Sequence, residues 1–160
     1  MLNLHIDLTN IEAIYLYTEY MEFLLKKYNY CNNYSIFNSK LYYKITLEKF
    51  INNLGKIFKL SDSNYIYAIC LLDKVIKSNI IKIHTYNVHL LSLVLLLLSS
   101  KMLEDTPYYN KDWGKYGGMS IYEINYSESY ILKALDYNLH ISLEDYETKL
   151  DFLRQKRYIK

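Results

Sequence analysis

The sequence predicts an all-α protein with a single domain. Its 160 residues are enough to bury a core of ordinary size. Apolar residues recur at intervals of three and four along most of the chain, and no segment shows the alternation typical of a strand. Residues 90–98 are leucine or valine except for Ser92. A helix that is apolar on all sides must be buried by neighbours, so we expect one central helix in a ring of amphipathic ones.

The first predicted helix covers residues 7–28 and begins with Asp7, Thr9 and Asn10 as candidate caps. Its expected apolar face consists of Ile11, Ile14, Tyr15, Met21, Leu24 and Leu25, with Thr18 on the same side. A polar, asparagine-rich break follows over residues 28–39.

Three helices are then expected over residues 46–58, 61–79 and 85–101, and the last of these should be the most buried. Residues 109–115 are interpreted as a loop. Two further helices are predicted over residues 120–139 and 142–157. The first starts with a capping box, Ser120 and Glu123, and the second with a weaker version, Ser142 and Asp145.

Composition excludes several classes of protein. The net charge is +2 and basic residues are dispersed, so nucleic acid is not an expected partner. The leucine-rich run is too short for a bilayer, which needs about 20 apolar residues, and the N-terminus lacks the pattern of a signal peptide. Two cysteines are too few for a disulfide framework. We therefore expect an intracellular protein of the cytoplasm, the nucleus or both.

No arrangement of residues predicts an active site. The four histidines, His5, His84, His89 and His140, lack the spacing of metal ligands. The "GKYGG" segment lacks the preceding strand and following Lys-Ser/Thr of a phosphate loop. We expect no enzymatic activity, no cofactor and no metal.

Two charged residues stand out beside apolar helices. Lys101 ends the leucine-rich helix, where a cation complements the helix dipole. Glu128 shares the expected helical face with Ile124, Ile131, Leu135 and Leu139. A carboxylate in an apolar stripe either lies at a solvated edge or has a partner. From the residues alone, both interpretations remain open.

Residues 43–139 resemble a cyclin box, the five-helix repeat that binds cyclin-dependent kinases. Residues 43–76 are similar without gaps to its first two helices, with "LLDK" where cyclins carry Ile-Asp-Arg. "LLLLSSKMLED" and "ESYILKALDYNL" resemble the third and fifth helices. "NVHLL", "YYN" and "GKYGGMS" are most similar to P-type cyclins, which have a single box. The predicted organisation is an N-terminal helix and polar linker over 1–42, a cyclin box over 43–140 and a C-terminal helix over 141–160.

The resemblance implies specific roles for several residues. The cyclin lysine corresponding to Lys101 binds kinase backbone carbonyls and pairs with the glutamate corresponding to Glu128. The residues that match further kinase-facing positions are Met102, Leu132, Tyr137 and Leu139. A structural pair of the family would become Lys44–Asp73. The mitotic substrate-docking motif is replaced by "YKITL", with Phe50 in place of its tryptophan.

The function implied by the resemblance is regulation of a cyclin-dependent protein kinase, by docking against the kinase helix that carries an active-site glutamate. The main alternative is a cyclin-fold adaptor in transcription or another assembly, and a helical enzyme is a further one.

Overall fold

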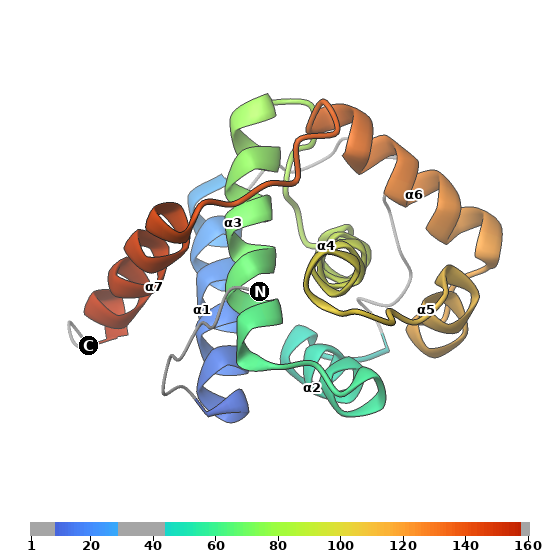
Figure 1. Cartoon of the computed structure of the whole chain (residues 1–160), viewed down its shortest axis with the longest axis horizontal. Coiled ribbons are helices and arrows are strands. Elements are labelled where there is room, and N and C mark those ends of the chain that lie inside the picture. The colour runs from blue at the N-terminus through green and yellow to red at the C-terminus, as the bar shows by residue number, and fades with distance from the viewer. Residues whose placement is uncertain (1–8, 29–43, 158–160) are drawn as a thin grey trace.

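A computed structural model describes residues 9–28 and 44–157, and helix α4, Val88–Leu103, lies at its centre (Figure 1). Every residue from Val88 to Ser100 is buried. The leucine-rich run is therefore the core of the molecule, and the predicted central helix is confirmed.

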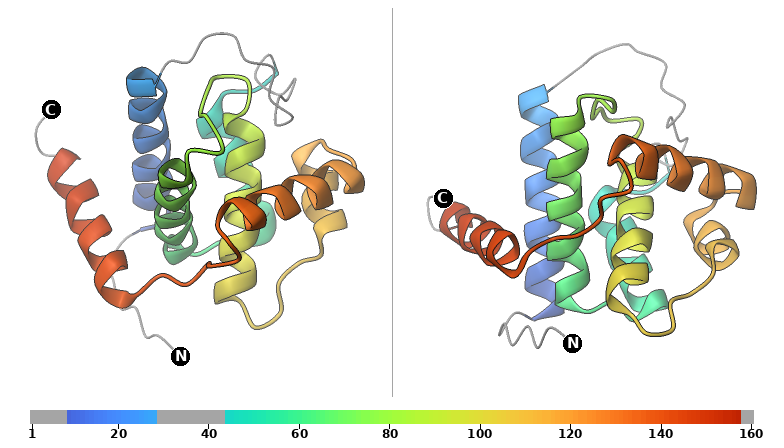
Figure 2. Two further views of the ribbon diagram at one scale, coloured as in Figure 1. Left: turned by 90° about the horizontal axis from the view of Figure 1, so that it is seen from above. Right: turned by 45° about the horizontal axis from the view of Figure 1, so that its top comes forward.

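Four helices surround α4: α2 (Leu47–Phe58), α3 (Asp62–Ser78), α5 (Asn110–Gly117) and α6 (Ile121–Ala134). Helix α1 (Asn10–Tyr28) packs against α3 and α2. The two views in Figure 2 show α7 (Leu143–Arg157) on the outer side, where it contacts α3 and α1. The described residues form seven helices and no strand, which confirms the all-α prediction.

The helices begin where side chains can bind free backbone amides. The Oγ1 of Thr46 accepts from the amide of Lys49 at 3.3 Å. In the predicted capping box, the amide of Glu123 donates to Ser120 at 3.2 Å and the amide of Ser120 donates to Glu123 at 2.7 Å. The amide of Asp145 donates to Oγ of Ser142 at 3.0 Å. Local sequence thus sets the starts of α2, α6 and α7.

The face expected for α1 is confirmed in part: Thr18, Met21 and Leu24 are buried, and Ile14 and Leu25 are partly buried against the core. Ile11 is 82% exposed and Tyr15 is 42% exposed. The buried residues are Ala13, Leu16, Tyr17, Thr18, Met21 and Leu24. Apolar side chains occur on both sides of this helix, so its period alone could not fix its rotation. The packing of α3 and α2 against it selects the buried face.

Residues 110–117 form helix α5, so the expectation of a loop there is wrong. Trp113 is fully buried and stacks on Phe58 with a ring-centroid distance of 3.8 Å. A Cβ at Gly117 would approach Leu93 of α4 to 2.7 Å, so this glycine allows the two helices to pack closely. The tertiary contacts of Trp113 and Gly117 stabilise a helix of only eight residues.

Helix α6 ends at Ala134, before the expected residue 139. Asp136 and Tyr137 follow with φ values of 50° and 57°, in the left-handed region. The amide of Tyr137 donates to the carbonyl of Leu132 and that of Asp136 to Lys133, at 2.8 and 3.0 Å. This is a Schellman turn, and it directs the chain away from the helix axis.

Candidate partner-binding site

Lys101 and Glu128 meet at one end of the central helix. Lys101 lies in the last turn of α4, and Glu128 lies in the middle of α6. The Nζ of Lys101 donates to Oε1 of Glu128 at 2.5 Å. The lysine side chain is 35% exposed and the glutamate side chain is 13% exposed. The sheltered carboxylate therefore has a partner, and the ammonium group remains accessible from outside.

Packing explains why the two side chains face each other. Ile124 and Ile131 lie one turn before and after Glu128, and both are fully buried against the core. They fix the rotation of α6 so that Glu128 is directed towards the end of α4. Because Lys101 follows the buried run that ends at Ser100, it is the first side chain of α4 to leave the core.

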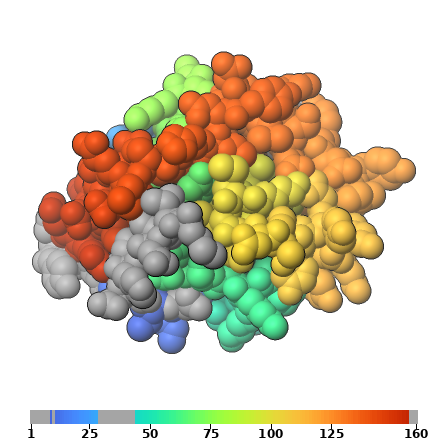
Figure 3. Space-filling model, viewed as in Figure 1, coloured from blue at the N-terminus to red at the C-terminus, as the bar shows by residue number. Residues whose placement is uncertain are grey.

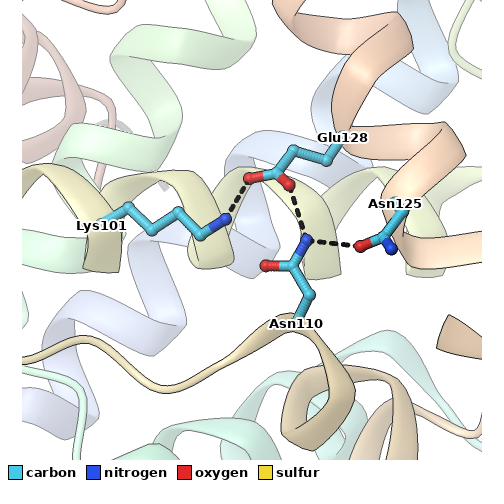
Figure 4. Close-up of polar contacts among 4 residues, drawn as sticks. All are labelled: Lys101, Asn110, Asn125 and Glu128. Carbon is cyan, nitrogen blue, oxygen red and sulfur yellow. Dashed lines mark hydrogen bonds and ion pairs between the residues drawn. The ribbon is translucent and has the colours of Figure 1, made fainter.

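Asn110, the first residue of α5, completes the network (Figure 4). Its Nδ2 donates to Oε2 of Glu128 at 2.6 Å and to Oδ1 of Asn125 at 2.9 Å. Both oxygens of Glu128 are thus occupied, one by a charged donor and one by a neutral donor. Asn110 was not among the expected site residues, although it belongs to the "YYN" segment that resembles P-type cyclins.

The apolar residues expected around the pair differ in exposure. Met102 is 44% exposed beside Lys101, and Tyr137 is 64% exposed in the turn after α6. Leu132 and Leu139 are partly buried and pack against the core. All four therefore retain some accessible surface, and two of them also contribute to the fold.

An open groove of about 1090 Å³ lies beside Lys101. It is formed by the connection between α4 and α5, the start of α5 and Ile121 of α6. Tyr109 in this wall is 74% exposed. Lys101 and Asn110, the two partners of Glu128, therefore both lie on the wall of this open groove.

The partners described for Asp73 are Lys149 and Tyr20, whereas the expected pair was Lys44–Asp73. The Nζ of Lys149 on α7 lies 2.5 Å from Oδ2 of Asp73, and the hydroxyl of Tyr20 on α1 donates to Oδ1 at 2.6 Å. Lys44 is exposed in a turn before α2. Asp73 thus joins α3 to α1 and α7, because α7 brings a lysine that lies far away in the sequence.

Two histidines and a cysteine outside this site are shielded from solvent in the fold. Burial lowers the pKa values of His84 and His89. Burial also raises the pKa of the Cys70 thiol to about 12, so this cysteine is a poor nucleophile near neutral pH. Over residues 9–28 and 44–157, no group of three or more His, Cys, Asp or Glu side chains could hold a metal ion. Within the same ranges, no helix has the length and apolar character needed to cross a membrane.

The fold and the paired Lys101 and Glu128 define an all-α protein with a candidate partner-binding face. The chain belongs to the cyclin family, whose model, described as Cyclin, matches residues 8–139. Members of this family are non-catalytic regulatory subunits of protein kinases, in agreement with the expectation that the chain is not an enzyme.

The similar proteins include plant and fungal cyclins. Cyclin-U4-2 of Arabidopsis thaliana is 29% identical over 123 residues, which cover 76% of this chain and 57% of the relative. The PHO85 cyclin-like protein psl1 of Schizosaccharomyces pombe is 26% identical over 120 residues, with coverage of 74% and 49%. Cyclin-P4-1 of Oryza sativa is 25% identical over 99 residues, with coverage of 61% and 47%.

These comparisons confirm the resemblance to P-type cyclins and add similarity to U-type cyclins. The chain spans about half the length of the curated relatives that it matches.

Proposed function

We propose that this protein is a regulatory subunit that binds and activates a cyclin-dependent protein kinase. The observation that supports this most is the Lys101–Glu128 pair, sheltered on the glutamate side and accessible on the lysine side. Met102 and Tyr137 provide exposed apolar surface for the same interface. A polar pair among apolar contacts is a common layout for a stable protein interface.

The proposed mechanism is allosteric. The chain docks against the kinase helix that carries an active-site glutamate, and so places that glutamate against the ATP-binding lysine. The cyclin contributes no chemical group to phosphoryl transfer. It activates the kinase because it binds the active conformation more tightly than the inactive one.

The nature of the kinase is suggested by the relatives. One of them is named a PHO85 cyclin-like protein, which supports a PHO85-type kinase as the partner. The complex would act inside the cell, in the cytoplasm, the nucleus or both.

The test is reconstitution of the complex. The purified full chain is mixed with a PHO85-type cyclin-dependent kinase, and association is measured by calorimetry and size-exclusion chromatography. Phosphorylation of a generic peptide substrate is measured with and without the chain. We expect a one-to-one complex, higher kinase activity and no turnover by the chain alone. Binding without activation would favour the adaptor function, and absence of binding would contradict the proposal.

A further inference from the structure

The segment that follows α6 is held by side chains of α3. It carries Tyr137 and Leu139, two of the residues that we assign to the kinase-facing surface. The hydroxyl of Tyr67 donates to the carbonyl of Leu139 at 2.7 Å. The Nζ of Lys74 donates to the carbonyls of Asn138 and His140, at 3.2 and 2.6 Å. Three consecutive carbonyls thus accept hydrogen bonds from one neighbouring helix.

The geometry of α3 explains why these two residues act together. Tyr67 and Lys74 are seven residues apart, which places them two turns apart on the same helical face. The ring of Tyr67 is buried, so its hydroxyl has a fixed position. Lys74 is partly buried, and its ammonium group spans the two carbonyls on either side of Leu139. Charged donors form the stronger class of hydrogen bond.

The held segment also has an unfavourable backbone conformation. Asp136 and Tyr137 are consecutive non-glycine residues with positive φ, a conformation that L-amino acids adopt at an energetic cost. Such residues persist where surrounding contacts determine the local structure, and they often occur at binding sites. The carbonyls of residues 138–140, which accept from α3, directly follow this turn. Their hydrogen bonds therefore oppose relaxation of the turn.

This segment lies next to the end of α4 on one face of the molecule. In Figure 3, the segment after α6 (orange-red) borders the C-terminal end of α4 and the connection that follows it (yellow). A shift of residues 137–140 would therefore alter the surface beside the end of the helix that carries Lys101.

We propose that Lys74 and Tyr67 are positioning residues for partner binding, which hold the segment of residues 137–140 so that Tyr137 and Leu139 can contact the kinase. This inference rests on the proposed function. Neither residue touches the kinase. Their contribution to affinity is transmitted through the carbonyls of residues 138–140.

The experiment compares kinase affinities of full-length variants by calorimetry, with the same PHO85-type kinase. The Lys74→Met variant loses both hydrogen bonds from the ammonium group and should bind about tenfold more weakly. Lys74→Arg keeps a cationic donor and should restore most of the affinity. Tyr67→Phe keeps the buried ring and removes only the hydroxyl, so its loss of kinase affinity should be smaller than that of Lys74→Met but measurable. Lys77→Met is the matched control, because Lys77 is an exposed lysine of the same helix. It should bind like wild type.

A double-mutant cycle separates positioning from a general effect on stability. Tyr137 is exposed, so Tyr137→Ala should fold normally. If Lys74 acts through the segment, Lys74→Met should cost clearly less affinity in the Tyr137→Ala background than in wild type. Hydrogen exchange of the free Lys74→Met variant should increase at residues 136–141 and remain unchanged in α4.

The outcomes distinguish this inference from the function on which it rests. If wild type binds the kinase and Lys74→Met and Tyr67→Phe bind equally well, the positioning role is wrong and the proposed function stands. Strictly additive effects in the cycle would also overturn the positioning role. If wild type fails to bind, the proposed function fails and the positioning role fails with it.

Discussion

Asn110 and Glu128 are joined by a hydrogen bond of 2.6 Å between Nδ2 and Oε2, while Oε1 of the same carboxylate accepts from Lys101. One glutamate therefore links three helices, because its two partners come from α5 and α4. This arrangement keeps a mostly sheltered carboxylate fully paired in the free protein. It also fixes the direction of the Lys101 side chain before any partner arrives.

Reversal of the charge at Lys101 tests the proposed interface. Lys101→Glu should keep the helical content of wild type but lower the melting temperature, because Oε1 of Glu128, whose side chain is 13% exposed, loses its donor at a cost of about 1–3 kcal/mol. In a kinase complex, it would place two carboxylates in a surface closed to water. Loss of one member of such a pair costs about 2–5 kcal/mol, or about 1.5 to 3.5 decades in Kd. Circular dichroism and calorimetry measure the two effects.

A charge swap provides the control for this prediction. The double variant Lys101→Glu/Glu128→Lys restores an ion pair between α4 and α6 but moves the ammonium group to the other helix. We expect it to regain the stability of the free protein and to remain defective in kinase binding. Full recovery of binding would indicate that only the pair matters, and that Lys101 itself does not contact the kinase.

Substitution of Asn110 should weaken both the fold and the site. Asn110→Ala removes the donor to Oε2 of Glu128, whose side chain is 13% exposed. An unsatisfied, mostly sheltered acceptor costs about 1–3 kcal/mol, which thermal or urea denaturation would detect. Asn110→Asp retains the shape but places a second carboxylate beside Glu128, so it should reduce stability and kinase affinity more than alanine does. Equal effects of the two substitutions would contradict the importance of the hydrogen bond.

The link between Asp73 and Lys149 gives a prediction about α7. Lys149→Met leaves the carboxylate of Asp73 with Tyr20 as its described partner, in a site where the Asp73 side chain is 20% exposed. We expect a loss of about 1–3 kcal/mol in the free energy of unfolding, measured by urea denaturation. Lys44→Met is the informative comparison, because the sequence favoured Lys44 as the partner. A larger loss for Lys44→Met than for Lys149→Met would show that the sequence-based pairing is correct in solution.

Strong local signals made much of the fold predictable. A leucine-rich helix that is apolar on all sides is expected in the core. Helix α4 is indeed buried throughout its first thirteen residues, Val88–Ser100. Ser120 and Glu123 form the predicted capping box because its bonds depend on residues three positions apart. The pairing of Lys101 with Glu128 was predictable from the order and spacing of the segments that resemble cyclins.

The missed features depend on distant parts of the chain. Part of the buried face of α1 was missed because apolar residues occupy both sides of this helix, and packing against α3 and α2 sets its rotation. Helix α5 is stabilised by the stacking of Trp113 on Phe58, which a glycine-rich local sequence does not reveal. Lys149 could not be assigned to Asp73 from sequence spacing because α7 returns to α3 only in the folded chain.

The buried histidines His84 and His89 should make the free energy of unfolding depend on pH. The Nε2 of His89 lies 2.8 Å from the carbonyl of Ile45 and donates to it, while its buried Nδ1 has no hydrogen-bond partner among the described residues. Nδ1 of His84 accepts from the amide of Tyr86 at 3.2 Å and cannot also carry a proton. Burial disfavours the charged form of both rings and lowers their pKa values below the ordinary 6.5.

The sign of the pH effect follows from these lowered pKa values. Below about pH 6.5, the unfolded chain takes up protons at these histidines before the folded protein does. The free energy of unfolding should therefore be highest above that pH and should fall as the solution becomes more acidic. Urea denaturation at about pH 7.5 and about pH 5.5 measures the difference.

His89→Gln keeps an amide donor for the carbonyl of Ile45 but does not titrate, so it should reduce this difference in the free energy of unfolding. An equal pH dependence for His89→Gln and wild type would mean that His89 does not resist protonation in the folded protein.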